Sequence, residues 1–347
     1  MGDTPGTAGV PPFRESEVSS QDESRVHGDL ITEFLIADSW NSDTPAVPAT
    51  TASTMNYRHA FHAGNFADVF KHIIIARILT HLREKIAPFR VIDTHAGEGL
   101  YDLAGDEARR TGEWRDGIGR LADAKLPADA AALLAPYFSA LHAWNRADEL
   151  RYYPGSPALA HHLMRPQDRL VACELEPHAA AALSRHLRGA TNVKVVHIDG
   201  WIALNAYVPV KERRGLMIVD PPFEQPNDLI RLADEVTAAH RKWPTGIYLM
   251  WYPVKGRDAP DRFIKRLRRA GLEKCLRAEF AVASPEPAGG LSACGVIVVN
   301  PPWRLAAEIG TLAPALLDAL GRDSGRGYVL EEIATTLPSR APVGRVR

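Results

Sequence analysis

The sequence has few cysteines and no long apolar run. Its three cysteines, Cys173, Cys275 and Cys294, are widely spaced and form no C-x-x-C pair, which argues against a disulfide framework or a cysteine-based zinc site. No apolar segment reaches the roughly 18 to 20 residues of a membrane helix, and the N-terminus lacks the basic and apolar regions of a secretory signal. We therefore predict a reduced, cytoplasmic protein without metal or membrane contact.

Net charge is also nearly absent, at −1 for the 347 residues, but it is unevenly distributed. Residues 1–54 hold nine acidic residues and two arginines, so residues 55–347 carry a net charge of +6. A modestly basic body is compatible with a polyanionic partner such as a nucleic acid. Residues 1–54 are also rich in Ser, Thr, Pro and Gly, which predicts a disordered acidic tail, with Met55 as the true or an alternative start.

From Met55 onward, short apolar runs alternate with helical stretches, which is typical of a mostly parallel sheet covered by helices. The predicted strands are Phe89–Asp93, Leu170–Glu174, Val193–Ile198, Leu216–Asp220, Gly246–Trp251, Leu276–Ala283 and Gly295–Asn300. The last two predict a hairpin at the edge of the sheet. We expect one α/β domain over residues 55–330, an inserted helical subdomain at about 106–150, and a flexible tail at 331–347.

Polar residues follow four of the predicted strands where each strand ends. They are Asp93 with Gly97, Glu174, Asp199 with Gly200, and Asp220. Ligands of open α/β sheets bind outside the carboxyl ends of the strands, so these residues are expected to converge on one crevice. Each is weak evidence alone, since acidic residues and glycines at strand ends are common, but together they favour a site for a nucleoside-containing ligand.

The segment Asp220-Pro221-Pro222-Phe223 matches a specific chemical need. An adenine amino group is a poor nucleophile, and its attack on a methyl group requires acceptors that hold the amino hydrogens. The Asp220 carboxylate and the Pro221 carbonyl can be these acceptors, and the proline that follows Pro221 helps to fix its conformation. Phe223 offers a face on which an extruded base can stack. The alternative is that the two prolines only end a strand.

A second segment of the same kind, Asn300-Pro301-Pro302-Trp303, also follows an apolar run. It would satisfy the same amine-holding, base-stacking pattern. We favour Asp220 as the catalytic residue because it comes next in order after Asp93, Glu174 and Asp199, whereas Asn300 follows the predicted edge hairpin.

Three histidines, His59, His62 and His72, lie within fourteen residues. Their spacings do not place pairs at i and i+4 on one helical face, so we predict no metal there. Asn65 is a suitable N-cap for a helix that carries Lys71 and His72. The functional interpretation is cofactor contact from His72 and base or phosphate contact from Tyr57, Arg58 and Lys71, against the simpler one of capping and core packing.

From Met55 to about Trp303 the chain resembles the bacterial 23S ribosomal RNA adenine-N6 methyltransferases of the J type. The resemblance rests on ordered motifs: Tyr57-Arg58-His59, His62-Ala63-Gly64-Asn65, Ala67-Asp68-Val69, Lys71-His72, Asp93-Thr94-His95-Ala96-Gly97, Arg110-Thr111-Gly112-Glu113, Arg151-Tyr152-Tyr153-Pro154-Gly155-Ser156-Pro157, Asp199-Gly200, Asp220-Pro221-Pro222, Trp251-Tyr252-Pro253 and Asn300-Pro301-Pro302-Trp303. The combination is highly specific.

The resemblance implies a Rossmann-like class I methyltransferase fold that uses S-adenosylmethionine and no metal. It also implies N6 methylation of one flipped-out adenosine, position 2030, in protein-free 23S RNA, without an obligate protein partner. The positions that match cofactor-contacting residues are His72, His95, Ser156, Glu174, Asp199 and Gly200, to which strand-end position adds Asp93, Gly97 and Asp220. Asp220 matches the catalytic acceptor, and Tyr57 the RNA contact. Family members commonly have Tyr where this chain has Phe223, and the acidic tail has no counterpart.

Two alternatives stay open: an adenine-N6 methyltransferase acting on DNA or another RNA, and a non-catalytic RNA-binding module of the same fold. Substrate discrimination is expected from the insertion, from the Tyr57–Lys71 segment, or from a basic helix with Arg262, Lys265, Arg266, Arg268 and Arg269. For that helix, a solvated face is the favoured interpretation. The oligomeric state is not encoded in any of these patterns.

Overall fold

A computed structural model of the chain describes residues 58–146, 149–285 and 290–333. The predicted acidic tail, the Met55 start, Tyr57 and residues 334–347 of the predicted C-terminal tail lie outside these ranges. The strands are β1 Arg90–Asp93, β2 Leu100–Asp102, β3 Tyr152–Pro154, β4 Arg169–Glu174, β5 Val193–His197, β6 Gly215–Val219, β7 Ile247–Pro253, β8 Cys275–Ala281, β9 Ala293–Val299 and β10 Gly327–Ile333.

The α-helices are α1 Phe66–Arg83, α2 Asp106–Thr111, α3 Arg120–Ala122, α4 Ala128–His142, α5 Ser156–Leu163, α6 Pro177–His186, α7 Gly200–Ala206, α8 Asp228–Lys242, α9 Asp258–Ala270 and α10 Leu305–Leu320. A 3₁₀ turn, η1, covers His59–Phe61, and a π-helical turn, η2, covers Arg115–Gly119. Among the described helices, none is long and apolar enough to cross a membrane.

An eight-stranded sheet forms the centre of the fold, in the order β10-β8-β9-β7-β6-β1-β4-β5. The neighbours from β7 to β5 pair in parallel, while β9, β8 and β10 pair antiparallel with their neighbours. The predicted mostly parallel α/β fold is therefore confirmed. All seven predicted strands are present. One detail differs: β10 pairs with β8, so the hairpin of β8 and β9 is followed by a further strand at the edge of the sheet.

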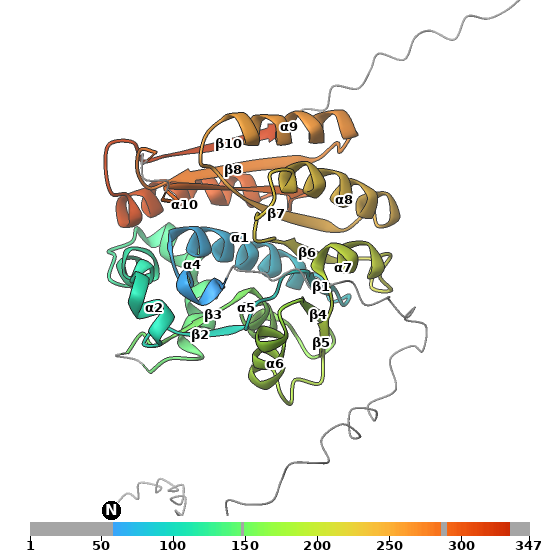
Figure 1. Cartoon of the computed structure of the whole chain (residues 1–347), viewed down its shortest axis with the longest axis horizontal. Coiled ribbons are helices and arrows are strands. Elements are labelled where there is room, and N and C mark those ends of the chain that lie inside the picture. Colours follow the sequence, from blue (N-terminus) through green and yellow to red (C-terminus); the bar gives the residue numbers. More distant parts are fainter. Residues whose placement is uncertain (1–57, 147–148, 286–289, 334–347) are drawn as a thin grey trace, which may run out of the picture. The chain divides into compact units, whose positions relative to one another are not determined.

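Helices cover both faces of this sheet (Figure 1). Apolar residues of α1, α5, α6 and α10 pack into one core cluster, and those of α8 and α9 into another on the opposite face. Helix α1 is buried along almost its whole length and starts at Asn65, whose side chain accepts hydrogen bonds from the backbone N–H groups of Ala67 and Asp68. The predicted N-cap is thus confirmed, and it fixes where Lys71 and His72 lie.

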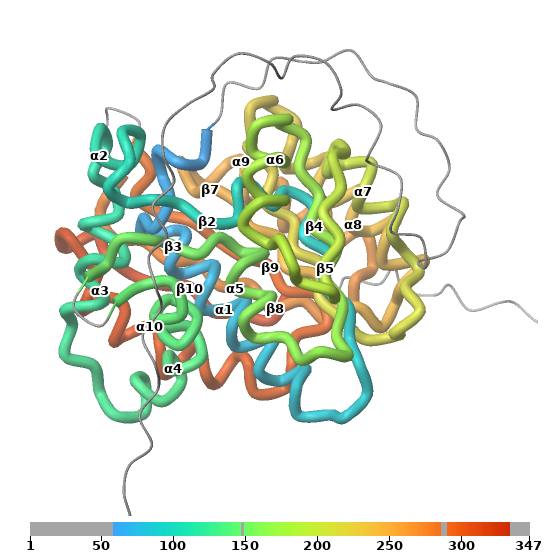
Figure 2. The backbone as a smooth tube through the Cα atoms, turned by 90° about the horizontal axis from the view of Figure 1, so that it is seen from below, coloured from blue at the N-terminus to red at the C-terminus, as the bar shows by residue number. Residues whose placement is uncertain are grey.

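The helices α2, α3 and α4 lie in the chain between β2 and β3, which form a two-stranded antiparallel ribbon outside the main sheet. These helices gather on the same side of the molecule as α10 (Figure 2), and α3 and α4 both contact α10. Gly155, just after β3, donates a backbone hydrogen bond to Gly99, just before β2, which extends the ribbon toward the loop after β1.

Candidate active site

The carboxyl ends of four adjacent parallel strands, β6, β1, β4 and β5, bring the predicted strand-end residues to one edge of the sheet. Asp93 ends β1 and is in register with Ala172 of β4 and Ile218 of β6. Glu174 ends β4, Asp220 directly follows β6, and Asp199 follows β5 by two residues. The convergence that strand order predicted is therefore what the structure has, and we call this edge the crevice.

Asp93 is a fully buried carboxylate with unsatisfied oxygens. It has no exposed surface, and neither Oδ1 nor Oδ2 has a hydrogen-bond partner among the described residues. Burial raises its pKa to about 7, against the opposing effects of the Ser156 hydroxyl and the Lys71 ammonium nearby. A buried polar group without a partner is costly, so Asp93 is poised to accept hydrogen bonds from a ligand that enters the crevice.

Glu174 shapes the glycine loop after β1. Its carboxylate accepts backbone hydrogen bonds from Gly97, at 2.8 Å, and from Leu175 and Glu176, each at 2.8 Å. Gly97 has a φ of +61°, and a Cβ at this position would lie 2.1 Å from the Tyr101 hydroxyl oxygen. The loop therefore needs glycine. Glu174 holds the Gly97 N–H through Oε2, which keeps a further lone pair for a ligand, whereas Oε1 already accepts two hydrogen bonds.

Asp199 and Gly200 start helix α7 beside the β1 loop. The Asp199 Oδ1 atom accepts a hydrogen bond from the Trp201 N–H at 2.8 Å, so one oxygen serves as the N-cap. A Cβ on Gly200 would lie 2.2 Å from the Thr94 carbonyl oxygen. Only a glycine allows the backbone of α7 to approach the β1 loop this closely.

His95 forms the wall between these two segments. Its ring lies edge-on to Trp201, with centroids 5.6 Å apart, and Trp201 carries the Arg231 guanidinium 4.4 Å from its own centroid. Burial, and secondarily the charge of Arg231, lowers the pKa of His95 to about 3. The imidazole is therefore neutral at physiological pH and can donate or accept a hydrogen bond without carrying charge.

His72 lies against β3, and Ser156 follows β3 by two residues. His72 is buried in α1, its Nδ1 is 2.9 Å from the Tyr153 hydroxyl, and the two rings stack with centroids 5.5 Å apart. Burial lowers the pKa of His72 to about 3. Ser156 is the first residue of α5 and is buried, where the N-terminal end of a helix favours negatively charged groups.

Lys71 joins helix α1 to the segment after β6. Its Nζ lies 2.5 Å from Asp220 Oδ2 and 2.8 Å from Asp68 Oδ1, and the side chain is 5% exposed. Burial disfavours the ammonium, but the two carboxylates outweigh burial and raise the pKa of Lys71 above its ordinary value. The predicted contact of Lys71 with an RNA phosphate does not fit this burial, because its charge is already shared by two carboxylates. Lys71 is paired instead with Asp220, the residue that the sequence predicts to be catalytic.

Asp68, the second carboxylate that pairs with Lys71, has two further contacts. Its Oδ2 accepts the Gly64 N–H at 3.1 Å and lies 2.8 Å from His59 Nε2. The charges of His59 and Lys71 outweigh burial and lower the pKa of Asp68 well below its usual range. The result is a continuous chain of side-chain contacts, from His59 through Asp68 and Lys71 to Asp220, that ends at the crevice.

Phe223 turns back from the strand end with a φ of +52° and packs against Trp251, with ring centroids 5.6 Å apart. It is half-buried, as are Asp220 and Pro222, while Pro221 is buried. The positive φ of a bulky residue is unusual and often marks a functional turn. The segment therefore presents a carboxylate, a backbone carbonyl and an aromatic ring at one strand end.

The second segment of this kind, which begins at Asn300, lies at the opposite edge of the sheet. Strand β9 runs antiparallel to β7, with Val299 opposite Tyr248, so its carboxyl end meets the amino end of β7. Asn300 donates hydrogen bonds to the carbonyls of Pro244 and Gly246, at 2.9 and 2.8 Å. Asn300 therefore holds the loop before β7 in place, at the edge of the sheet opposite Asp93, Glu174 and Asp199.

The predicted RNA-contacting residues are only partly described. Tyr57 lies outside the described ranges, and Arg58 is exposed at the start of η1. Arg58 pairs with Glu107 of α2 at 2.6 Å, and both Arg58 and Arg110 approach the Phe61 ring, at 6.0 and 5.7 Å. The helical insertion thus lies against the segment that leads to Lys71.

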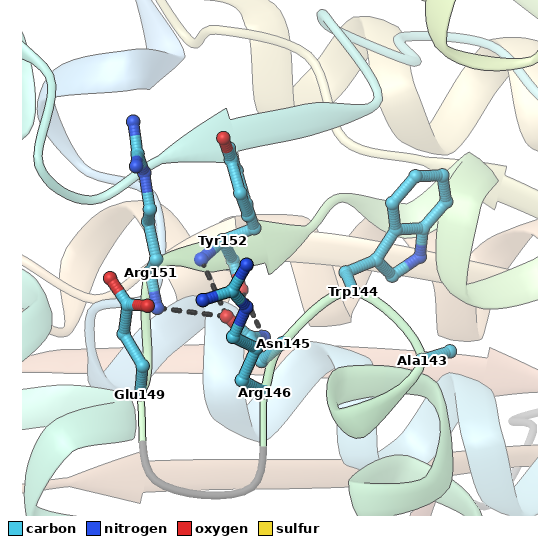
Figure 3. A pocket seen from close by; sticks show the side chains of 7 residues that line it. All are labelled: Ala143, Trp144, Asn145, Arg146, Glu149, Arg151 and Tyr152. Atoms are coloured by element: carbon cyan, nitrogen blue, oxygen red, sulfur yellow. Dashed lines mark hydrogen bonds between the residues drawn. The ribbon is translucent and has the colours of Figure 1, made fainter. Parts of the chain in front are cut away.

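A separate hollow of about 450 Å³ lies at the outer end of the β2–β3 ribbon. Its lining includes the Trp144 and Tyr152 rings and the Arg146 and Arg151 side chains (Figure 3). Asn145 forms its floor by bonding to the backbone of both Arg151 and Tyr152. No predicted site residue lines it, so we do not assign it to the crevice.

Sequence reasoning missed several residues that shape the crevice, above all Asp68, Tyr153 and Trp201. Asp68 had a detectable signal, because an acid three residues before Lys71 on a helix forms an i,i+3 pair. Tyr153 and Trp201 had none, since their contacts with His72 and His95 join segments far apart in the chain.

Comparison with known proteins gives consistent matches. A family model described as ribosomal RNA large subunit methyltransferase D, RlmJ, matches residues 86–331. The chain is 40% identical to ribosomal RNA large subunit methyltransferase J of Escherichia coli over 262 residues, which is 76% of this chain and 92% of that protein. It is 38% identical to the protein of the same name from Haemophilus influenzae, over 80% and 99% of the two chains. A crystal structure from Legionella pneumophila, 34% identical, aligns with a TM-score of 0.72 over 78% of this chain and 98% of that one.

Proposed function

Because the chain belongs to the RlmJ family of ribosomal RNA large subunit methyltransferases, we propose that it methylates one adenosine of protein-free 23S RNA. The proposed methyl donor is S-adenosylmethionine, and the proposed acceptor is the N6 atom of adenine 2030. The base is flipped out of the RNA so that its amino group reaches the crevice. The name of the family supports ribosomal RNA methylation; adenine, its N6 atom and its position are our proposal.

The observation that best supports an adenine amino group as the methyl acceptor is the carboxylate of Asp220, which Lys71 holds in place. Lys71 binds its Oδ2 at 2.5 Å, which leaves Oδ1 to accept one amino hydrogen, and the Pro221 carbonyl can accept the other. With both hydrogens held, the nitrogen lone pair is directed toward the methyl donor. The loop mainly positions the amine, because its proton becomes acidic only after the methyl group is attached.

The residues of the crevice fit S-adenosylmethionine. When bound, this cofactor supplies the methyl group as a sulfonium. Asp93 offers two unsatisfied buried oxygens for donors such as an amino group, and the carboxylate of Glu174 suits ribose hydroxyls. Gly200 lets the start of α7 pack directly against Thr94 and His95, because a Cβ there would lie 2.2 Å from the Thr94 carbonyl oxygen, and this packing fixes the β1 loop beside the proposed cofactor site. Asp199, His72 and Ser156 complete the set of proposed contacts.

A methyl-transfer assay tests the function with three substrates: naked 23S RNA, assembled large subunits and duplex DNA. Transfer should occur to naked 23S RNA, and mapping should find one N6-methyladenine. The matched variants are Asp220→Ala and Asn300→Ala, which alter the same position in the two similar segments. Asp220→Ala should abolish transfer with the fold intact, whereas Asn300→Ala should keep it at saturating RNA.

Other results would select other functions. Transfer only to duplex DNA would make the chain a DNA adenine methyltransferase. Cofactor binding without transfer to any of the three substrates would favour a non-catalytic RNA-binding module. A wild-type rate in Asp220→Ala would refute the assignment of that carboxylate, and loss only in Asn300→Ala would transfer the role to the second segment.

A further inference from the structure

The edge of the sheet opposite the crevice is strongly basic. Seven segments meet there: residues 83–90, 164–169, 187–192, 207–214, 241–246, 271–275 and 300–304. Together they contain thirteen Lys and Arg residues and four acidic residues. Three of these acids already pair with arginines of the same edge: Glu84 with Arg304, Asp168 with Arg165, and Glu212 with Arg90. We call these segments the basic edge.

Hydrogen bonds join these segments into one continuous surface. The Arg165 guanidinium donates to the Lys85 carbonyl at 2.8 Å, and the Arg214 guanidinium donates to the Ala87 carbonyl at 2.9 Å. The Thr245 hydroxyl donates to the Arg213 carbonyl at 2.6 Å. The half-buried arginines therefore hold the loops in place and leave other cations exposed.

The Asn300 segment contacts three other segments of the basic edge. Asn300 bonds to Pro244 of the loop before β7, and its N–H donates to the Lys274 carbonyl at 2.8 Å. Four residues later, Arg304 pairs with Glu84 at the end of α1. The motif that resembled a second catalytic segment thus builds this edge.

Trp303 is the last residue of that motif and is 85% exposed. The Arg304 guanidinium lies 5.3 Å from its ring centroid. An exposed tryptophan gains nothing from packing in the folded chain, but exposed aromatic rings next to cations are the usual platforms for unpaired nucleic acid bases. The basic edge therefore has both a polycation and a stacking surface.

The crevice edge has the opposite charge. Its described segments, residues 94–99, 174–176, 198–199, 220–227 and 254–257, contain six acidic residues against Lys255 and Arg257. Phosphate groups are repelled there, so affinity for a long RNA has to come mostly from elsewhere on the protein. The basic edge is a large positive surface that can supply it.

We propose that the basic edge is a second RNA-binding surface, which binds the phosphate backbone and one unpaired base of the RNA whose target adenosine enters the crevice. This inference rests on the proposed function for the identity of the polyanion. Strands of four to seven residues separate the two edges, which is about 13 to 23 Å at the usual rise per residue. The RNA therefore has to extend well beyond its target nucleotide to reach both.

The test compares two triple variants with equal loss of charge. The first, Lys85→Gln with Arg241→Gln and Lys274→Gln, removes exposed cations of the basic edge. The matched control, Arg262→Gln with Lys265→Gln and Arg269→Gln, removes exposed cations from α9. Affinity for in vitro transcribed 23S RNA is measured by filter binding at several salt concentrations, and methyl transfer is measured as KM and kcat.

We expect the basic-edge triple to weaken binding about tenfold and to lower the salt slope of log K by about 2, since each lost phosphate contact removes about 0.7. KM should rise while kcat stays at the wild-type value. The α9 triple should bind nearly as the wild type does. Trp303→Ala should also raise Kd several-fold, whereas Tyr328→Ala, which removes another exposed aromatic ring, should not.

Equal losses in the two triples would overturn the inference, because the effect would then be one of total charge. Unchanged binding in the basic-edge triple and in Trp303→Ala would overturn it as well. Failure of the proposed function has a different signature: the wild-type protein would transfer no methyl group to RNA, while the binding comparison would still report on the basic edge.

Discussion

Replacing Lys71 with Met removes the cation that binds Asp68 and Asp220 inside the protein. The Nζ atom lies within 2.8 Å of both carboxylates, and the side chain is 5% exposed. Breaking a buried ion pair from one side leaves uncompensated charge and typically costs about 3 to 5 kcal/mol. In a domain of this size, we expect the unfolding midpoint to fall by about 10 °C.

The pH dependence of this loss has a definite sign. In Lys71→Met the Asp68 carboxylate loses one of the charges that lower its pKa, so its native pKa rises relative to the wild type. The native variant then binds more protons than the native wild type, and the stability lost by the substitution grows as pH rises. The difference in unfolding free energy between wild type and variant should therefore be larger at pH 8 than at pH 5. Lys71 itself adds no slope in this range, because its raised pKa keeps it protonated.

Urea unfolding at pH 5 and pH 8 measures the stability, and methyl transfer at saturating RNA measures kcat. We expect kcat to fall by about 100-fold or more, which corresponds to about 2.7 kcal/mol of lost positioning of Asp220. Lys265→Met on the exposed face of α9 is the control and should change stability by less than about 0.5 kcal/mol. A loss below 1 kcal/mol in Lys71→Met, or a loss that grows toward pH 5, would refute the argument from a buried ion pair.

Three further predictions concern the crevice. Burial lowers the pKa of His72 to about 3, so below about pH 6.5 this histidine is protonated only in the unfolded chain, and the wild type loses stability as pH falls. In urea unfolding between pH 6 and 4, His72→Gln should therefore reduce the slope of unfolding free energy against pH by about 1.4 kcal/mol per pH unit. Burial raises the pKa of Asp93 to about 7, so ionisation of this carboxyl group destabilises the native state as pH rises. Asp93→Asn should therefore raise the thermal unfolding midpoint more at pH 8 than at pH 5. The same variant should bind S-adenosylmethionine more weakly in calorimetry. Gly200→Ala places a Cβ 2.2 Å from the Thr94 carbonyl oxygen and should reduce cofactor affinity at least tenfold, whereas Gly256→Ala, with open space around it, should bind the cofactor normally.

The strands were predictable because each is a short apolar run between turn residues. β6, with all five residues buried, and β9, with six of seven buried, leave no ambiguity about their place in the sheet. β2 and β3 have only three residues each, too few for an apolar pattern to appear. β10 lies at the edge of the sheet and has only one buried residue of seven, so no apolar run marked it as a strand.

The crevice was predictable as far as it depends on strand ends. Parallel strands bring their carboxyl ends together, so Asp93, Glu174 and Asp220 could be grouped without coordinates. Lys71 was predicted to contact the RNA because a lysine in a helix is usually exposed, and its sequence context gives no sign of burial. Its contact with Asp220 spans 149 residues, and only the packing of α1 against the sheet brings the two side chains together.

The two similar segments, at Asp220 and Asn300, show why local sequence alone did not separate the proposed catalytic segment from a structural one. Both follow a strand, and both have a residue with positive φ, Phe223 in one and Asn300 in the other. Strand direction decides the difference: β6 ends at the crevice, whereas antiparallel β9 ends at the opposite edge. The side chains match these places, because Asp220 accepts from the Lys71 ammonium while the Asn300 amide donates to two carbonyls. An aspartate at 300 would face those carbonyls with negative charge, and an asparagine at 220 would leave Lys71 with half of its compensation, so neither residue can take the place of the other.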